Sequence, residues 1–313
     1  MDEITTLHTN KCKSYIDFML SQQQWSGLTK AEIERWLSNF HNLQPNEMLL
    51  VYKLLTNVIY FSEKDVLGAL REGVYNCVCY KSILEKQKSA DFALSQRALA
   101  NIADDEIRKT YFIPLLDSDA PHESGNYIIR LLVQQGVIPP ECSVFVDKLA
   151  PAFQSGRVTR LVIVDDCVGS GDQLRGFWNN TTIKIGTEDI LLKDLCLKYR
   201  IIANYLIPFG YDRNISKIKK EFADLNIYCT RTLSDAQKVF SDNSYIWKDI
   251  AERDDARRLF DSISKECRIP LHGYKELDFA FIMHQTIPDW SLPLFWKENA
   301  DWKLLMRRKN SSD

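Results

Sequence analysis

Residues 160–175, RLVIVDDCVGSGDQLR, decide the fold of this chain. They begin with an apolar run, 161–164, that leads directly into two carboxylates, Asp165 and Asp166. A small-residue turn, 169–171, then comes before a helical pattern. A short, continuous apolar run bounded by turn residues is typical of a strand that is buried on both faces of a parallel sheet. The stretch therefore predicts a strand, a turn and a helix of an α/β fold, with both acids at the carboxyl end of the strand.

Other short apolar runs alternate with helical stretches along the rest of the chain. They are residues 111–116 (YFIPLL), 143–146 (SVFV), 201–207 (IIANYLI), 226–229 and 279–284. This alternation is typical of a mostly parallel sheet with helices on both faces. We therefore expect an α/β domain with a doubly wound parallel sheet over residues 109–313.

Residues 1–108 show helical periodicity instead. Apolar residues recur three and four positions apart, for example within 33–40, and Thr29 followed by Glu32 predicts a capping box at the start of that helix. We expect an N-terminal helical domain over 1–108.

The segment 233–268 is highly charged and has a helical pattern. Acidic and basic residues alternate along it at helical spacing, as in 249–258 (DIAERDDARR). Mixed signs at this spacing favour a solvated helix face over a ligand site.

The composition excludes several classes of protein. With a formal net charge of -2 over 313 residues, no global field would draw the chain to nucleic acid or to an anionic membrane. The sequence has no signal-peptide pattern, and no apolar run approaches the roughly 18 residues of a membrane span. Its eight cysteines show no metal-ligand spacing and lie mostly in apolar stretches, so we expect free thiols, a cytoplasmic location and no membrane partner.

The acids and the turn together predict an anion site. Ligands of open α/β sheets bind at the carboxyl ends of the strands. Small residues let backbone N–H groups converge there, and the following helix adds the positive end of its dipole. Carboxylates accept hydroxyl hydrogens or ligate Mg²⁺. A phosphorylated ribose suits such a site.

Residues 162–173 resemble the phosphoribosyl pyrophosphate motif of the type I phosphoribosyltransferases, in which a hydrophobic strand precedes two acids and a loop that ends in Ser/Thr-Gly. The resemblance implies a type I phosphoribosyltransferase-like fold. It also implies that Asp165 and Asp166 are the catalytic acids, which hold the ribose hydroxyls and, with the ligand, Mg²⁺. The phosphate loop would then consist of Cys167, Val168, Gly169, Ser170, Gly171, Asp172 and Gln173.

The same family has a diphosphate-binding loop after its first strand. Residues 117–125 (DSDAPHESG) occupy that place, which makes Ser124 and Gly125 candidates for diphosphate binding. Arg130 and Lys148 follow nearby loop and strand positions and are further candidates, with a plain surface cation as the alternative for each.

Two departures from the family leave the activity open. Gly169 stands where purine-salvage enzymes carry an acidic general base, and Asp172 with Gln173 replaces the usual end of the loop. The chain is therefore expected either to transfer or hydrolyse a glycosidic bond at the anomeric carbon, or to bind a nucleotide without turnover.

A closer resemblance covers most of the chain. Trp36, Leu37, Phe40, the run DDCVGSGDQ and residues 284–296 (HQTIPDWSLPLFW) look like phosphoribosyltransferase-like proteins of bacterial conflict systems. The resemblance implies an antiphage defence effector, with a retron reverse transcriptase and its DNA, or another defence protein, as partner. The alternative is a non-catalytic module of such a complex, which senses a nucleotide or docks on a partner.

Simpler structural explanations compete with these functional ones. An apolar strand ending in two acids also fits a Walker B element, but the sequence lacks GxxxxGK[ST]. The acid pair could simply be a solvated strand end with a helix cap. His272 and His284 are more typical of structural histidines, and the aromatic residues of 290–296 are more typical of core than of a base-stacking platform.

Overall fold

The structure, a computed structural model, describes residues 3–116, 124–284, 286–299 and 301–307. The chain forms two compact units. The sheet unit consists of residues 67–232, and the split unit combines 1–66 with 233–313. These units do not coincide with a division at residue 108. The units are defined by contacts in space, whereas the expected domains are continuous stretches of sequence. The domains 1–108 and 109–313 therefore stay a prediction.

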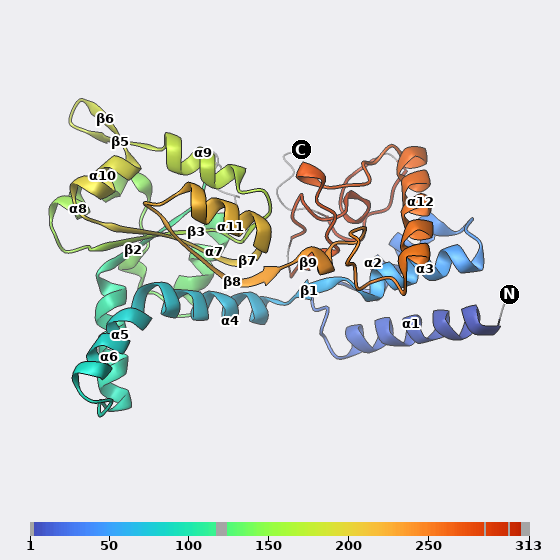
Figure 1. Ribbon diagram of the computed structural model, residues 1–313, viewed down its shortest axis with the longest axis horizontal. Helices are drawn as coiled ribbons and strands as arrows, with labels where there is room; N and C mark the ends of the chain where they lie inside the picture. Colours follow the sequence, from blue (N-terminus) through green and yellow to red (C-terminus); the bar gives the residue numbers. More distant parts are fainter. Residues whose placement is uncertain (1–2, 117–123, 285, 300, 308–313) are drawn as a thin grey trace. The chain divides into compact units, whose positions relative to one another are not determined.

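The sheet unit alternates strands and helices along most of its length (Figure 1). Its elements are α4 (Glu63–Val74, which begins in the split unit), α5 (Tyr80–Ser89), α6 (Gln96–Arg108), β2 (Thr110–Pro114), α7 (Ser124–Gln134), α8 (Leu149–Gln154), β3 (Arg160–Val164), β4 (Cys167–Val168), α9 (Asp172–Asn180), β5 (Thr182–Ile185), β6 (Glu188–Leu191), α10 (Leu192–Lys198), β7 (Ile202–Tyr211), α11 (Asp212–Glu221) and β8 (Asn226–Leu233).

The central sheet is built around β3 and β7. β2, β3 and β7 pair in parallel in that order, β4 pairs in parallel with the far end of β7, and β8 also pairs with β7. β5 and β6 form a separate antiparallel hairpin. The parallel central sheet with its helices confirms the expected α/β class.

Helices cover both faces of this sheet (Figure 1). On one face, side chains of α9, α10 and α11, including Trp178 and Ile218, pack with Ile163 and Tyr205 of the central strands. α4 lies against the other face, where Gly73 is so close to Leu206 that a Cβ would come within 2.4 Å of its Cδ1 atom. Burial on both faces explains why β3 is a continuous apolar run.

The strand expected at 143–146 is not formed. Ser143 makes a single bridge to Phe112 of β2, and the chain then turns into a 3-10 helix at Val146–Lys148. Phe145 is exposed, so this apolar run does not have the buried partners that extend a strand.

The split unit combines α-helices with long stretches that belong to no helix or strand. Its elements are α1 (Glu3–Ser21), α2 (Lys30–Leu37), α3 (Pro45–Thr56), β1 (Ile59–Phe61), α12 (Ile250–Cys267) and β9 (Phe281–Met283). Thr29 and Glu32 form the expected capping box of α2. The apolar run 279–284 supplies β9, which pairs in parallel with β1 and not with the central sheet. None of the helices in the described ranges is long and apolar enough to cross a membrane.

Candidate functional site

The two predicted acids lie at a gap in the central sheet. β3 and β4 pair with β7 in the same register, with Asp165 and Asp166 opposite Ile207 and Pro208. The Asp165 N–H still donates to the Leu206 carbonyl (3.1 Å), and the strand pairing then stops until Cys167. Proline has no N–H to donate to a neighbouring strand. The sequence of β7 therefore explains why the ladder opens at the acid pair.

Asp165 is turned into the protein. Its side chain belongs to a residue only 3% exposed, and its two carboxyl oxygens accept hydrogen bonds from the Tyr205 hydroxyl (3.0 Å) and from the Asp166 N–H (2.9 Å). Burial, and secondly the charge of Asp166, raise the pKa of Asp165 well above its usual range. Burial and the neighbouring Asp165 also raise the pKa of Tyr205, so this phenol keeps its proton and donates it.

Asp166 is partly exposed. Its backbone N–H is fixed by the Asp165 carboxyl, and the residue as a whole is less buried than Asp165. The structure thus gives the two predicted acids different positions, although they are adjacent in the sequence. A ligand in solution reaches Asp166 more readily than Asp165.

The glycine loop begins as β4 and ends at the first turn of α9. Cys167 and Val168 form β4, and Gly171 has a left-handed backbone (φ 82°). A Cβ at Gly171 would lie 2.4 Å from the Ile218 Cδ1 atom, so this position requires glycine for its conformation and for space. The Ser170 Oγ accepts the Asp172 N–H (3.2 Å), which leaves its hydroxyl hydrogen available to an acceptor.

Two polar side chains hold the loop from outside. Asn214 of α11 donates to the Gly169 carbonyl (2.8 Å), and Arg175 of α9 donates to the Ser170 carbonyl (3.0 Å). Arg175 also pairs with Asp172 (3.0 Å) and with Glu221 (2.8 Å). The extra negative charge at the end of the loop is therefore balanced, which reduces its repulsion of a phosphate. Gln173, the second residue of α9, is exposed.

Sequence reasoning missed the residues that hold this site. Arg175 could have been found from its place three residues after Asp172 on the same helix. Tyr205 gave a weaker signal: a tyrosine hydroxyl inside the apolar run 201–207 needs a hydrogen-bond partner, but the sequence does not say which. Asn214 gave none, because its contact joins two segments 45 residues apart.

The diphosphate candidates lie apart from one another. Ser124 begins α7, and Gly125 packs so closely on β2 that a Cβ would be 2.6 Å from the Leu115 carbonyl oxygen. Because β2 pairs with β3, this helix start reaches the sheet edge that carries the acids. Residues 117–123 of the expected diphosphate loop lie outside the described residues.

Arg130 and Lys148 are both exposed. Arg130 lies over the Tyr127 ring at 6.0 Å, and Lys148 pairs with Asp147 at 3.1 Å. Among the described residues, neither makes a hydrogen bond or ion pair with the acids or the glycine loop. Their role in diphosphate binding stays a prediction.

A magnesium ion would find few protein ligands here. In the part of the chain that the structure describes, no three His, Cys, Asp or Glu side chains are grouped to hold a metal ion. Mg²⁺ commonly binds one or two carboxylates together with substrate phosphates and water. The accessible Asp166 with its neighbour Asp165 fits that mode, but not a metal site built by protein alone.

The other sequence candidates belong to the split unit. The Nδ1 atom of His284 lies 3.3 Å from the Ser26 Oγ, and its Nε2 atom lies 3.7 Å from Glu63. Trp290 and Phe295 are buried, and Trp290 stacks on Phe281 with ring centroids 4.8 Å apart. The aromatic run is therefore core, as its composition favoured.

Comparison with known proteins supplies the family. No curated protein and no solved structure matches the chain. A family model, described as PRTase-CE, matches residues 33–308, which contain the sheet unit, most of the split unit and the whole acid-loop segment, residues 160–175. By that match the chain belongs to the PRTase-CE family and is a phosphoribosyltransferase-like protein.

Proposed function

We propose that this protein binds a phosphoribosyl pyrophosphate-type or nucleotide ligand at the loop from Cys167 to Gln173, and that it acts as an antiphage effector. The observation that carries the binding proposal is the accessible Asp166 beside a glycine loop that leads into the N-terminus of α9. Backbone N–H groups and the helix dipole favour a phosphate at such a place.

Different residues of the site would bind different parts of the ligand. Asp166 would accept hydrogen bonds from the ribose hydroxyls, and the loop amides, with the Ser170 hydroxyl, would hold the 5′-phosphate. Asp165 would act mainly by positioning Asp166, because the Asp165 carboxyl accepts a hydrogen bond from the Asp166 N–H. Ser124 and Gly125 at the start of α7 would face the diphosphate.

Mg²⁺ would be held by Asp166, and through water by Asp165, and would neutralise charge on the diphosphate. The protein itself supplies orientation of the ribose and a carboxylate close to the positive charge that develops at the anomeric carbon. Transfer or hydrolysis at that carbon is the reaction this arrangement suits.

A non-catalytic role is the second candidate, and two observations favour it. Gly169 provides no side chain to act as a base, and both carboxyl oxygens of Asp165 are already engaged within the protein. On this alternative the glycine loop and its acids sense a nucleotide, and the chain docks on a retron reverse transcriptase with its DNA or on another defence protein.

Calorimetric titration with phosphoribosyl pyrophosphate and Mg²⁺ tests the binding proposal. Asp166→Asn should weaken binding by about tenfold or more, since it removes a charged acceptor. Asp194→Asn, at an exposed acid of α10, is the matched control and should bind like the wild type. No heat of binding with the wild-type protein would refute the proposal.

Release of pyrophosphate or free base from candidate nucleotides then separates the two candidates. Turnover that Asp166→Asn abolishes, with an unchanged melting temperature, supports the enzyme. Binding without turnover supports the sensor. A plaque assay with the native gene neighbourhood, comparing wild type with Asp166→Asn, tests the defence role.

A further inference from the structure

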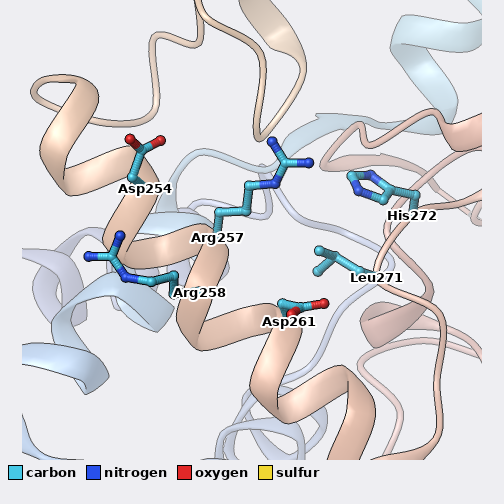
Figure 2. A pocket seen from close by; sticks show the side chains of 6 residues that line it. All are labelled: Asp254, Arg257, Arg258, Asp261, Leu271 and His272. Carbon is cyan, nitrogen blue, oxygen red and sulfur yellow. The ribbon is translucent and has the colours of Figure 1, made fainter.

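A cavity in the split unit lies outside the phosphoribosyl site. Its volume is about 440 Å³. Four residues of α12 and two of the segment after it line the cavity (Figure 2): Asp254, Arg257, Arg258, Asp261, Leu271 and His272. All six belong to the split unit, whereas the glycine loop belongs to the sheet unit.

The basic side chains of α12 are mostly neutralised by acids. The pairs are Arg253 with Asp242 and Asp254, Arg258 with Asp255, and Lys265 with Asp261. Arg257 is different. It has Asp254 three residues before it and Asp261 four residues after it, yet it forms no ion pair within the described parts of the chain.

Arg257 extends instead across the cavity toward the His272 ring (Figure 2). The His272 ring packs edge-to-face with the Phe240 ring, with centroids 6.0 Å apart and an interplanar angle of 84°. The Nδ1 atom of His272 is buried and has no hydrogen-bond partner among the described residues. A proton on Nδ1 would be a buried donor without an acceptor, which is the rarer and costlier arrangement. The proton of the neutral ring therefore belongs on Nε2, the other ring nitrogen.

Two donor groups thus face this cavity: the guanidinium N–H groups of Arg257 and the Nε2–H of His272. An oxyanion between them would satisfy both. The acids Asp254 and Asp261 line the same cavity and would repel each further negative charge, which favours a singly charged carboxylate over a phosphate dianion.

We propose that this cavity, the α12 cavity, binds the carboxylate group of a small organic acid or of a peptide C-terminus. Arg257 holds one edge of the carboxylate, and His272 donates to the other side. Leu271 gives an apolar wall for the carbon chain.

Saturation-transfer NMR on the methyl protons of acetate tests this site. Arg257→Gln and His272→Leu should each weaken acetate binding by about tenfold, as expected for the loss of a charged or buried donor. His272→Gln places an amide N–H near the Nε2 position and should retain most of the binding. Arg97→Gln, at an exposed arginine of α6, makes the same change of net charge and should have no effect.

Melting temperatures of all four variants show whether each is folded, and the His272 ring resonance reports directly on the cavity in Arg257→Gln. Acetate binding that is absent in the wild type, or unchanged in both Arg257→Gln and His272→Leu, would overturn the proposal. Displacement of acetate by inorganic phosphate at lower concentration would also overturn it.

The same assay with N-acetyl-diglycine separates the two sources of the carboxylate. Tighter binding than acetate assigns the site to a chain terminus, and equal binding assigns it to a small acid. Because the assay contains no phosphoribosyl ligand and its variants lie in the α12 cavity, failure of phosphoribosyl pyrophosphate to bind at Gly169–Gln173 would not affect this result.

Discussion

The acid-loop segment and α12 are both rich in Asp and Arg, and they hold these charges in opposite ways. On α12, Arg258 and Asp255 pair three residues apart with side chains 73% and 58% exposed. In the acid-loop segment, Asp165 is 3% exposed and bonded to Tyr205. The difference teaches that the preceding residues decide what a carboxylate does. The carboxylate that directly follows the buried strand becomes part of the interior, whereas a carboxylate on a helix with mixed signs stays in solvent.

The largest effect is expected where the loop turns into α9. Gly171→Ala should lower the free energy of unfolding by about 3 kcal/mol, because it adds backbone strain at φ 82° and a clash with Ile218. Gly136→Ala has a similar φ of 64° but open space around it and should cost only about 1 kcal/mol. Urea unfolding measures both. Equal losses would show that the loop is not tightly packed on α11.

Tyr205→Phe tests whether the buried acid depends on its neighbour. It leaves a buried carboxyl oxygen without its donor and should cost about 2 kcal/mol of stability. Tyr199→Phe removes a hydroxyl that makes no hydrogen bond within the described residues, and should change stability little. A Tyr205→Phe variant as stable as the wild type would mean that Asp165 is not held by this hydroxyl.

The pH dependence of stability separates Asp165 from the exposed acids. Its folded pKa is raised, so the folded state binds the proton more tightly than the unfolded state does. The contribution of Asp165 to stability is then fully present below the unfolded value near 3.8 and is lost as the pH rises through the folded pKa. Asp165→Asn removes this titration, so its stability relative to wild type should increase with pH across that window. A difference that is flat with pH would contradict the burial argument.

Arg175→Gln is expected to act more weakly. Arg175 is partly exposed, and its pairs with Asp172 and Glu221 are screened by water, so the loss should be about 1 kcal/mol. The loss should shrink at high salt. A salt-independent loss would instead assign the effect to its hydrogen bond with the Ser170 carbonyl.

The smallest effect is expected on α12. Arg258→Gln removes one exposed helix pair and should cost about 0.3 kcal/mol in thermal unfolding. A loss of unfolding free energy comparable to that of Tyr205→Phe would contradict the contrast between the exposed charges of α12 and the buried acid of the acid-loop segment.

The sequence predicted the features that depend on local pattern. The apolar run before Asp165 predicted a buried parallel strand, and the mixed charges of 249–258 predicted the solvated helix α12; both are confirmed. The capping box at Thr29 is confirmed for the same reason, since two residues three positions apart decide it.

Features that depend on distant contacts were not predicted. Whether 143–146 becomes a strand depends on burial by other segments, and the exposed Phe145 shows that this burial is missing. The hydroxyl that binds Asp165 and not Asp166 belongs to Tyr205, which comes from another strand. No pattern within 160–175 could have separated the two acids.

Backbone amide NMR of the glycine loop tests the central claim most directly. Adding ribose 5-phosphate to the ¹⁵N-labelled protein should shift the amide signals of Gly169 to Gln173, and Asp166→Asn should weaken the response. If these amides stay unchanged at saturating ligand while the protein is folded, the loop does not hold a phosphorylated ribose, and the account is wrong at its centre.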